Sequence, residues 1–290
     1  MSETVDLLRI VHQTVYRYRT AVHFLPHRLV LRPREGHDLR VESLALATIP
    51  RSDFAWSRDI FGNSIALAYF TEPGEELRVE SDVTVRRTIH AGTPPPATIP
   101  IPYPLQYDTL EQAAVAVYLQ PVFPQEAETL QEWLRAQQLT GTATAEEFVL
   151  QLTAAIHQLV RYQRRDEKGV QSPATTLTLG SGSCRDAACL LMESARHLGI
   201  ATRFASGYLD CAATRAARGV THAWTEVYFP GLGWRGYDPT TGKRCTQQHI
   251  VTGVSNHPRG VMPVTGRFAG SAADFIEMSV RVEFSAPILP

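Results

Sequence analysis

The sequence predicts an α+β protein in which an N-terminal antiparallel β-sandwich precedes a core of helices followed by an antiparallel sheet. Three observations indicate this. Apolar and polar residues alternate through the first part of the chain, a proline-rich stretch follows, and the remainder shows a helical period before it returns to strand patterns. We therefore expect three parts: a β-sandwich domain at 1–88, a connector at 89–124 and a core at 125–290.

The first domain is predicted from alternation and turn residues. From Leu8 to Tyr18 every second position carries a residue suited to a half-buried strand. Turn residues such as Phe61-Gly62-Asn63 separate the segments, which favours antiparallel pairing. Similar strand patterns occur at 29–31, 41–47, 64–70 and 77–85.

Six prolines between His90 and Tyr107 remove backbone donors and fix φ, so this stretch is expected to be an extended connector. Beyond it, Thr144 and Glu147 have the spacing of a capping box and precede a row of apolar residues on one helical face. A shorter helix is expected near 125–138. Strands are expected near 202–209, 223–229, 234–238 and 276–284.

Bulk properties exclude several classes of protein. A net charge of −1 with dispersed basic residues gives no cationic stripe, so we expect no nucleic-acid partner. Without a long apolar run or a signal-like N-terminus, we expect no membrane association and a cytoplasmic location. The four cysteines are too sparse for a disulfide framework and lack the spacing of a zinc site. We expect no metal and no cofactor; the oligomeric state is left open.

Cys184 is the strongest candidate for a nucleophile. It follows the turn residues Gly180 to Ser183 and precedes a run of apolar residues at helical spacing that stops at Gly199. This places the thiol at the first turn of a helix, where unpaired amides and the helix dipole favour a thiolate. The backbone N–H of Cys184 could also stabilise an oxyanion. The alternative is a small, packed cysteine without a chemical role.

Two later segments favour the catalytic interpretation. Residues 221–229 form a strand with His222, Trp224 and Glu226 on one face, and Asp238 ends the next strand before a proline. For Asp238 to share the face of His222, paired positions across this hairpin must sum to an even number, as Tyr228 with Trp234 does. We therefore predict an odd-length loop or a bulge. Asp186, in the first turn after Cys184, is expected to stabilise the helix or pair with a cation.

These residues resemble the transglutaminase-like superfamily, in the bacterial branch described as cysteine proteases with their own N-terminal β domain. Two motifs in the first half add to the likeness, His12-x-Thr-x-Tyr16 and Asp59-x-Phe-Gly-Asn63. The motifs of the second half are Gly182-Ser-Cys184-Arg-Asp186, Ala205-Ser-Gly-Tyr208, His222-Ala-Trp-Thr-Glu-Val-Tyr228 and Gly233-Trp-Arg-Gly-Tyr-Asp-Pro-Thr240. The resemblance implies a papain-like core with a triad of Cys184, His222 and Asp238.

The function expected from this constellation is cysteine-dependent acyl transfer on the amide bonds of a peptide or protein, through a thioester on Cys184. Hydrolysis is favoured. A transglutaminase that uses an amine acceptor, and a non-catalytic binding module on the same fold, are the alternatives; a metal-dependent hydrolase lacks a second histidine at ligand spacing. Candidates to line the acyl site or to donate to the oxyanion are Trp224, Tyr208 and Tyr162.

Overall fold

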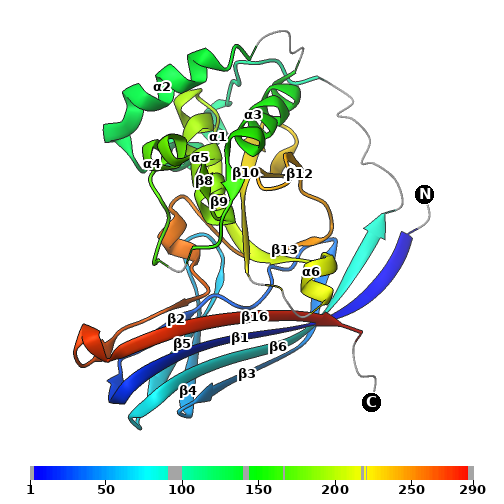
Figure 1. Ribbon diagram of the computed structural model, residues 1–290. Coiled ribbons are helices and arrows are strands. Elements are labelled where there is room, and N and C mark those ends of the chain that lie inside the picture. The colour runs from blue at the N-terminus through cyan, green and yellow to red at the C-terminus, as the bar shows by residue number, and fades with distance from the viewer. Residues whose placement is uncertain are drawn as a thin grey trace.

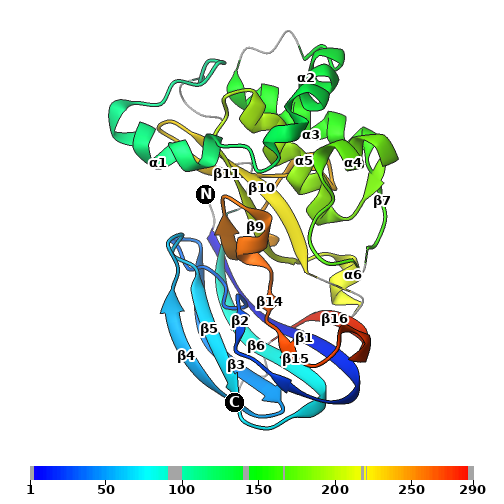
Figure 2. The same cartoon turned by 90° about the vertical axis from the view of Figure 1, so that its left-hand side faces the viewer.

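The computed structural model describes residues 3–90, 100–139, 144–165, 167–216, 219 and 221–286. A β-sandwich lies at one end of the molecule, and helices packed around a separate sheet lie at the other (Figure 1). A view from a second side shows the same two parts (Figure 2). The predicted α+β class, with an N-terminal antiparallel β-sandwich before a core of helices and an antiparallel sheet, is confirmed.

Two antiparallel sheets form the sandwich. The first is dominated by long strands, because β1 pairs with β6 from Glu3 onwards and with β16 from Arg9 onwards. Its strands are β3 (Leu39–Ile49), β6 (Gly74–His90), β1 (Glu3–Phe24), β16 (Phe275–Ser285) and the short β15 (Phe268–Ala269). The second sheet has the order β14 (Val264–Thr265), β2 (His27–Leu29), β5 (Ser64–Phe70) and β4 (Ser52–Arg58).

The core consists of helices packed on an antiparallel sheet. Its strands run in the order β12 (Lys243–Arg244), β11 (Gly233–Asp238), β10 (His222–Phe229), β9 (Thr202–Leu209) and β13 (His249–Ser255). The helices are α1 (Thr109–Leu119), α2 (Ala127–Ala136), α3 (Ala145–Leu159), α4 (Pro173–Leu179), α5 (Cys184–His197) and α6 (Ala212–Arg215). Minor elements are η1 (Pro124–Glu126), η2 (Pro258–Val261), η3 (Ala272–Asp274) and the parallel pair β7 (Arg161–Tyr162) and β8 (Ser181–Gly182).

The capping box that the sequence predicts at α3 is confirmed, since Thr144 accepts from the N–H of Glu147 and Glu147 accepts from that of Thr144. The expected connector differs from the structure. Helix α1 lies within 89–124 and begins at its own capping box, in which Asp108 is paired with Glu111. Prolines dominate this segment and obscured the helix signal that follows them. Residues 91–99 of the expected extended stretch lie outside the described residues.

The last strands of the chain lie in the sandwich, although the expected grouping placed them with the core at 125–290. Strand β16 hydrogen-bonds to β1, and Val264 of β14 pairs with Leu29 of β2. An alternating pattern predicts that a segment is a strand, but it carries no information about which sheet the strand joins. The domain boundaries themselves stay a prediction.

One face of the first sheet is shared between two neighbours. Even-numbered residues of β1 supply both contacts: Tyr18 and Phe24 pack with Leu29 of the second sheet, whereas Ile10 packs with Tyr208 of the core. One half of this face is therefore buried by the second sheet and the other half by the core. Residues 256–263, which we call the bridging segment, run from β13 of the core to β14 of the second sheet and so connect these two neighbours.

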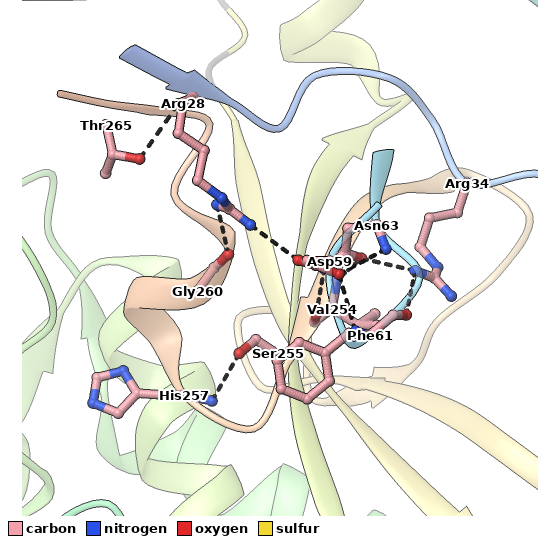
Figure 3. Close-up of polar contacts among 10 residues, drawn as sticks. All are labelled: Arg28, Arg34, Asp59, Phe61, Asn63, Val254, Ser255, His257, Gly260 and Thr265. Atoms are coloured by element: carbon pink, nitrogen blue, oxygen red, sulfur yellow. Dashed lines mark hydrogen bonds and ion pairs between the residues drawn. The ribbon is translucent and has the colours of Figure 1, made fainter. Parts of the chain in front are cut away.

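The Asp59-x-Phe-Gly-Asn63 motif joins the sandwich to the core (Figure 3). The Asn63 side chain donates to the carbonyl of Val254 at 2.7 Å and accepts from its N–H at 2.9 Å, so it satisfies both main-chain groups of a core strand. Asp59 accepts from the N–H and the side-chain amide of Asn63, and also pairs with Arg28 at 3.0 Å. Arg28 in turn donates to the carbonyl of Gly260 in the bridging segment at 2.9 Å.

We predict that Asn63→Ala lowers the free energy of unfolding by about 3 kcal/mol, because it leaves a buried N–H and a buried carbonyl of Val254 without partners. Urea unfolding followed by fluorescence measures the change. The control is Asn256→Ala, two residues beyond Val254 at a half-buried site, where a change within about 0.5 kcal/mol is expected. Equal effects of the two substitutions would contradict the role given to Asn63.

Candidate active site

Helix α5 begins at Cys184, as the sequence predicts, and its first turn is held by a buried carboxylate. Asp186 has no exposed side-chain surface and accepts from the N–H and the hydroxyl of Ser183 at 2.8 and 2.7 Å. Its other oxygen accepts from Arg165 and from the N–H of Gln171. The expectation that Asp186 is a helix-stabilising, ion-paired residue is confirmed. Cys184 is 9% exposed, at the positive end of the helix dipole.

His222 and Asp238 meet on adjacent strands. His222 begins β10 and Asp238 ends β11, and Nε2 of His222 lies 3.0 Å from Oδ2 of Asp238. The predicted pairing of Tyr228 with Trp234 is confirmed, as is the odd-length loop, since three residues separate the paired Phe229 and Gly233. Because paired positions sum to an even number, both side chains point to the same face of the sheet.

The pKa of His222 depends on two neighbouring residues, Asp238 and Cys184. Burial lowers the pKa of His222, but hydrogen bonds to Asp238 and Cys184, with their negative charges, outweigh this and raise that pKa to about 10. Since Nε2 contacts Asp238, Nδ1 is the ring nitrogen that is left for an interaction with Cys184. Burial raises the pKa of Asp238, but hydrogen bonds from His222 and His249 hold it well below its ordinary value.

Sequence reasoning missed His249. It begins β13, and its Nε2 lies 3.3 Å from the same Oδ2 of Asp238 that bonds His222. Its ring stands edge-on to Trp224, with centroids 5.2 Å apart. No local pattern could reveal this contact, because β13 reaches the site only through its pairing with β9.

His222, Asp238 and His249 also form the one cluster among the described residues that could hold a metal ion, with donor atoms within 4.8 Å of one another. The structure therefore supplies the second histidine that the sequence appeared to lack. In the hydrogen-bonded arrangement both imidazoles bond Asp238, so a metal ion would have to replace those contacts.

A cavity of about 110 Å³ opens beside Cys184 and His222, with several times the volume that one water molecule needs. One wall carries Tyr162, Arg164, Arg165 and Arg185. A second set of lining residues, which we call the apolar wall, comes from the bridging segment and from β16 of the sandwich: Val261, Met262, Pro263, Met278 and Val280. The sandwich thus forms part of the cleft.

Of the three residues proposed to line the site, the structure brings one to the cavity. Tyr162 lines it, and burial and the charge on Cys184 raise the pKa of its hydroxyl. Trp224 is buried next to His222, with its ring centroid 6.1 Å from that of His222, and does not line this cavity. Tyr208 lies away from the cavity, where its hydroxyl is 3.1 Å from His12 of the sandwich. It links the two parts of the molecule.

Comparison with known proteins assigns the family. One family model, the bacterial transglutaminase-like N-terminal region, matches residues 8–86, and the transglutaminase-like superfamily model matches residues 134–239. The chain belongs to the transglutaminase-like superfamily. The second match contains Cys184, His222 and Asp238, and the first contains both N-terminal motifs.

Two relatives of this superfamily chain illustrate the likeness. An uncharacterized protein of Mycobacterium leprae (strain TN) is 33% identical over 105 residues, which make up 35% of this chain and 37% of that protein. Among solved structures, one described as a "putative cysteine protease" from Cytophaga hutchinsonii is 17% identical, with a TM-score of 0.72. That alignment covers 100% of this chain and 94% of the other, and it shows a shared fold. None of the described helices is long and apolar enough to span a membrane.

We predict that Cys184→Ser lowers the pKa of His222 from about 10 towards its ordinary value, because a hydroxyl offers no negative charge near neutral pH. In the wild type, His222 stays protonated until the pH rises through about 10; in the variant the proton leaves at lower pH. A histidine-selective NMR titration measures both curves. An unchanged pKa would mean that Cys184 and His222 are not coupled.

Proposed function

We propose that the protein is a cysteine-dependent acyl-transfer enzyme that acts on amide or peptide bonds, and that hydrolysis is its reaction. Cys184 is the nucleophile, His222 the base and Asp238 the residue that orients His222. The observation that carries the proposal is the position of His222, which bonds Asp238 through Nε2 at 3.0 Å and lines one cavity with Cys184, the thiol at the start of α5.

The reaction begins with a Cys184 thiolate and a protonated His222. The sulfur attacks the carbonyl carbon, and the oxygen takes up the negative charge, facing the N–H of Cys184 and the hydroxyl of Tyr162. His222 then protonates the leaving nitrogen, the C–N bond breaks, and a thioester with Cys184 is left. The raised pKa of Tyr162 keeps its hydroxyl protonated and able to donate.

The second half of the cycle releases the acyl group. Water attacks the thioester carbonyl while His222 accepts its proton, the C–S bond breaks, and the acid leaves with the thiolate restored. Asp238 stabilises the imidazolium throughout. A primary amine in place of water would give the transglutaminase reaction from the same thioester, and a binding module would need none of these steps.

We predict that iodoacetamide at pH 6 modifies Cys184 faster than Cys211 or Cys245, which are only partly buried and serve as internal controls. Burial raises the pKa of the Cys245 thiol, so this cysteine in particular should react slowly. In His222→Ala the rate at Cys184 should fall about 100-fold, because the imidazolium that stabilises the thiolate is gone. Peptide mass mapping after timed quenching measures each site.

Equal rates at Cys184 and Cys211 in the wild type would overturn the proposal in favour of a binding module. A fast reaction that His222→Ala leaves unchanged would show that the helix start alone activates the thiol, and the proposed base would be wrong.

A further inference from the structure

We propose that the β-sandwich supplies the specificity wall of the active site and that this wall selects acyl donors with an apolar side chain next to the scissile bond. The inference rests on the proposed function of Cys184. It begins with strand β16, which belongs to the sandwich and yet reaches the cavity of the core.

Strand β16 presents one face to two environments. Val282 and Phe284 are buried between the sandwich and the core, in a cluster that also contains Tyr208 and Ile250. Because side chains on one face of a strand recur every two residues, Met278 and Val280 extend the same apolar row. These two are half-buried and line the cavity beside Cys184. The apolar row of β16 therefore packs against the core at Val282 and Phe284 and lines the cavity at Met278 and Val280.

The His12-x-Thr-x-Tyr16 motif lies beside this wall, on the neighbouring strand β1. His12, Thr14 and Tyr16 pair across the sheet with Val282, Val280 and Met278, in that order. His12 is 1% exposed and bonds both Thr14, at 2.8 Å, and Tyr208 of the core, at 3.1 Å. The motif thus fixes the position of β16 relative to the core, and so the position of the wall relative to Cys184.

The bridging segment completes the wall and is fixed separately. Arg28 donates to the carbonyl of Gly260, next to Val261, while Asp59 pairs with Arg28 (Figure 3). Thr265 donates to the carbonyl of Arg28 at the far end of the segment. Both motifs of the N-terminal domain therefore support the apolar residues that face the thiol.

Arginines also line the cavity, and Arg165 and Arg185 among them are bound within the protein. Arg165 pairs with the buried Asp186 at 2.8 Å, and Arg185 donates to the carbonyls of Arg165 and Glu167. These contacts hold the segment beside Tyr162. The apolar wall, by contrast, gains most from a ligand, because covering Met278 and Val280 removes apolar surface from water.

The test compares three reagents with one reactive group, the chloromethyl ketones of N-acetyl-leucine, N-acetyl-glycine and N-acetyl-aspartate, as alkylators of Cys184. In the wild type the leucine reagent should react at least about tenfold faster than the glycine reagent. Rates are corrected for the intrinsic reactivity of each reagent towards glutathione. Faster reaction of the aspartate reagent would show that the arginine wall selects the substrate, and it would overturn the inference.

Substitutions in β16 test whether Met278 and Val280 cause the preference for the leucine reagent. In the double variant Met278→Gln and Val280→Thr, which keeps side-chain size while adding polar atoms, the ratio of leucine to glycine rates should fall about fivefold. Ile276→Thr is the matched control, because Ile276 lies on the same strand, is 50% exposed and does not line the cavity. An equal fall in the control would contradict the role of the wall.

The outcomes separate this inference from the proposed function. If the wild type reacts slowly with every reagent and with iodoacetamide, the nucleophile itself is wrong. If iodoacetamide reacts fast and the three ketones show equal corrected rates, only the apolar wall is wrong. The comparison of reagents on the wild type decides this even if the double variant does not fold.

A second inference rests on the hydrogen bonds of His249: we infer that His249 is a positioning residue that fixes the carboxylate of Asp238. The N–H of Thr246 donates to Nδ1 of His249 at 3.2 Å, so the ring proton of a neutral His249 is on Nε2 and is donated to Asp238. The N–H of Thr240 donates to the other carboxylate oxygen at 2.8 Å. Asp238 is thus held at both oxygens, and His222 receives a carboxylate that cannot rotate.

The test is the rate at which iodoacetamide modifies Cys184 in two variants. His249→Leu should lower the rate about tenfold, and His249→Gln, whose amide can donate, should restore most of it. A purely structural residue would lower the melting temperature in both variants and leave the rate within about twofold of the wild type, which would overturn the inference. If His249→Leu does not fold, His249→Asn, too short to reach Asp238, replaces it.

Discussion

The arrangement of the site depends on one buried charge. Asp238 has no exposed side-chain surface, and a buried carboxylate is tolerated only where hydrogen-bond donors replace the lost water. Three donors converge on it, from His222, His249 and the N–H of Thr240. They come from β10, from β13 and from the turn after β11, so the order of the core sheet is the condition for satisfying this carboxylate.

The sandwich contributes residues to the cavity beside Cys184 as well as packing against the core. Its first sheet divides one face between the second sheet and the core, and the cavity contains residues of β16 and of the segment that connects these two partners. The polar contacts of Asn63 and His12 cross the same junction. A change at the junction can therefore move one wall of the cavity without altering Cys184, His222 or Asp238.

Local sequence patterns predict several features of the fold and of the candidate site. The start of α5 at Cys184 follows from turn residues before a helical period, and the pairing of β10 with β11 follows from the parity that places Asp238 beside His222. His249 and the pairing of β16 with β1 could not be predicted in this way. Both depend on which strands become neighbours, and side-chain alternation along one strand does not contain that information.

The order of strands in the chain has a consequence for synthesis. Cys184, His222 and Asp238 precede β16 in the chain, whereas the cavity beside Cys184 and His222 is lined in part by Met278 and Val280 of β16. The edge of β1 that β16 covers stays unpaired with it until residues 275–285 have left the ribosome. Cys184 and His222 are thus synthesised before the strand that completes the lining of the cavity beside them.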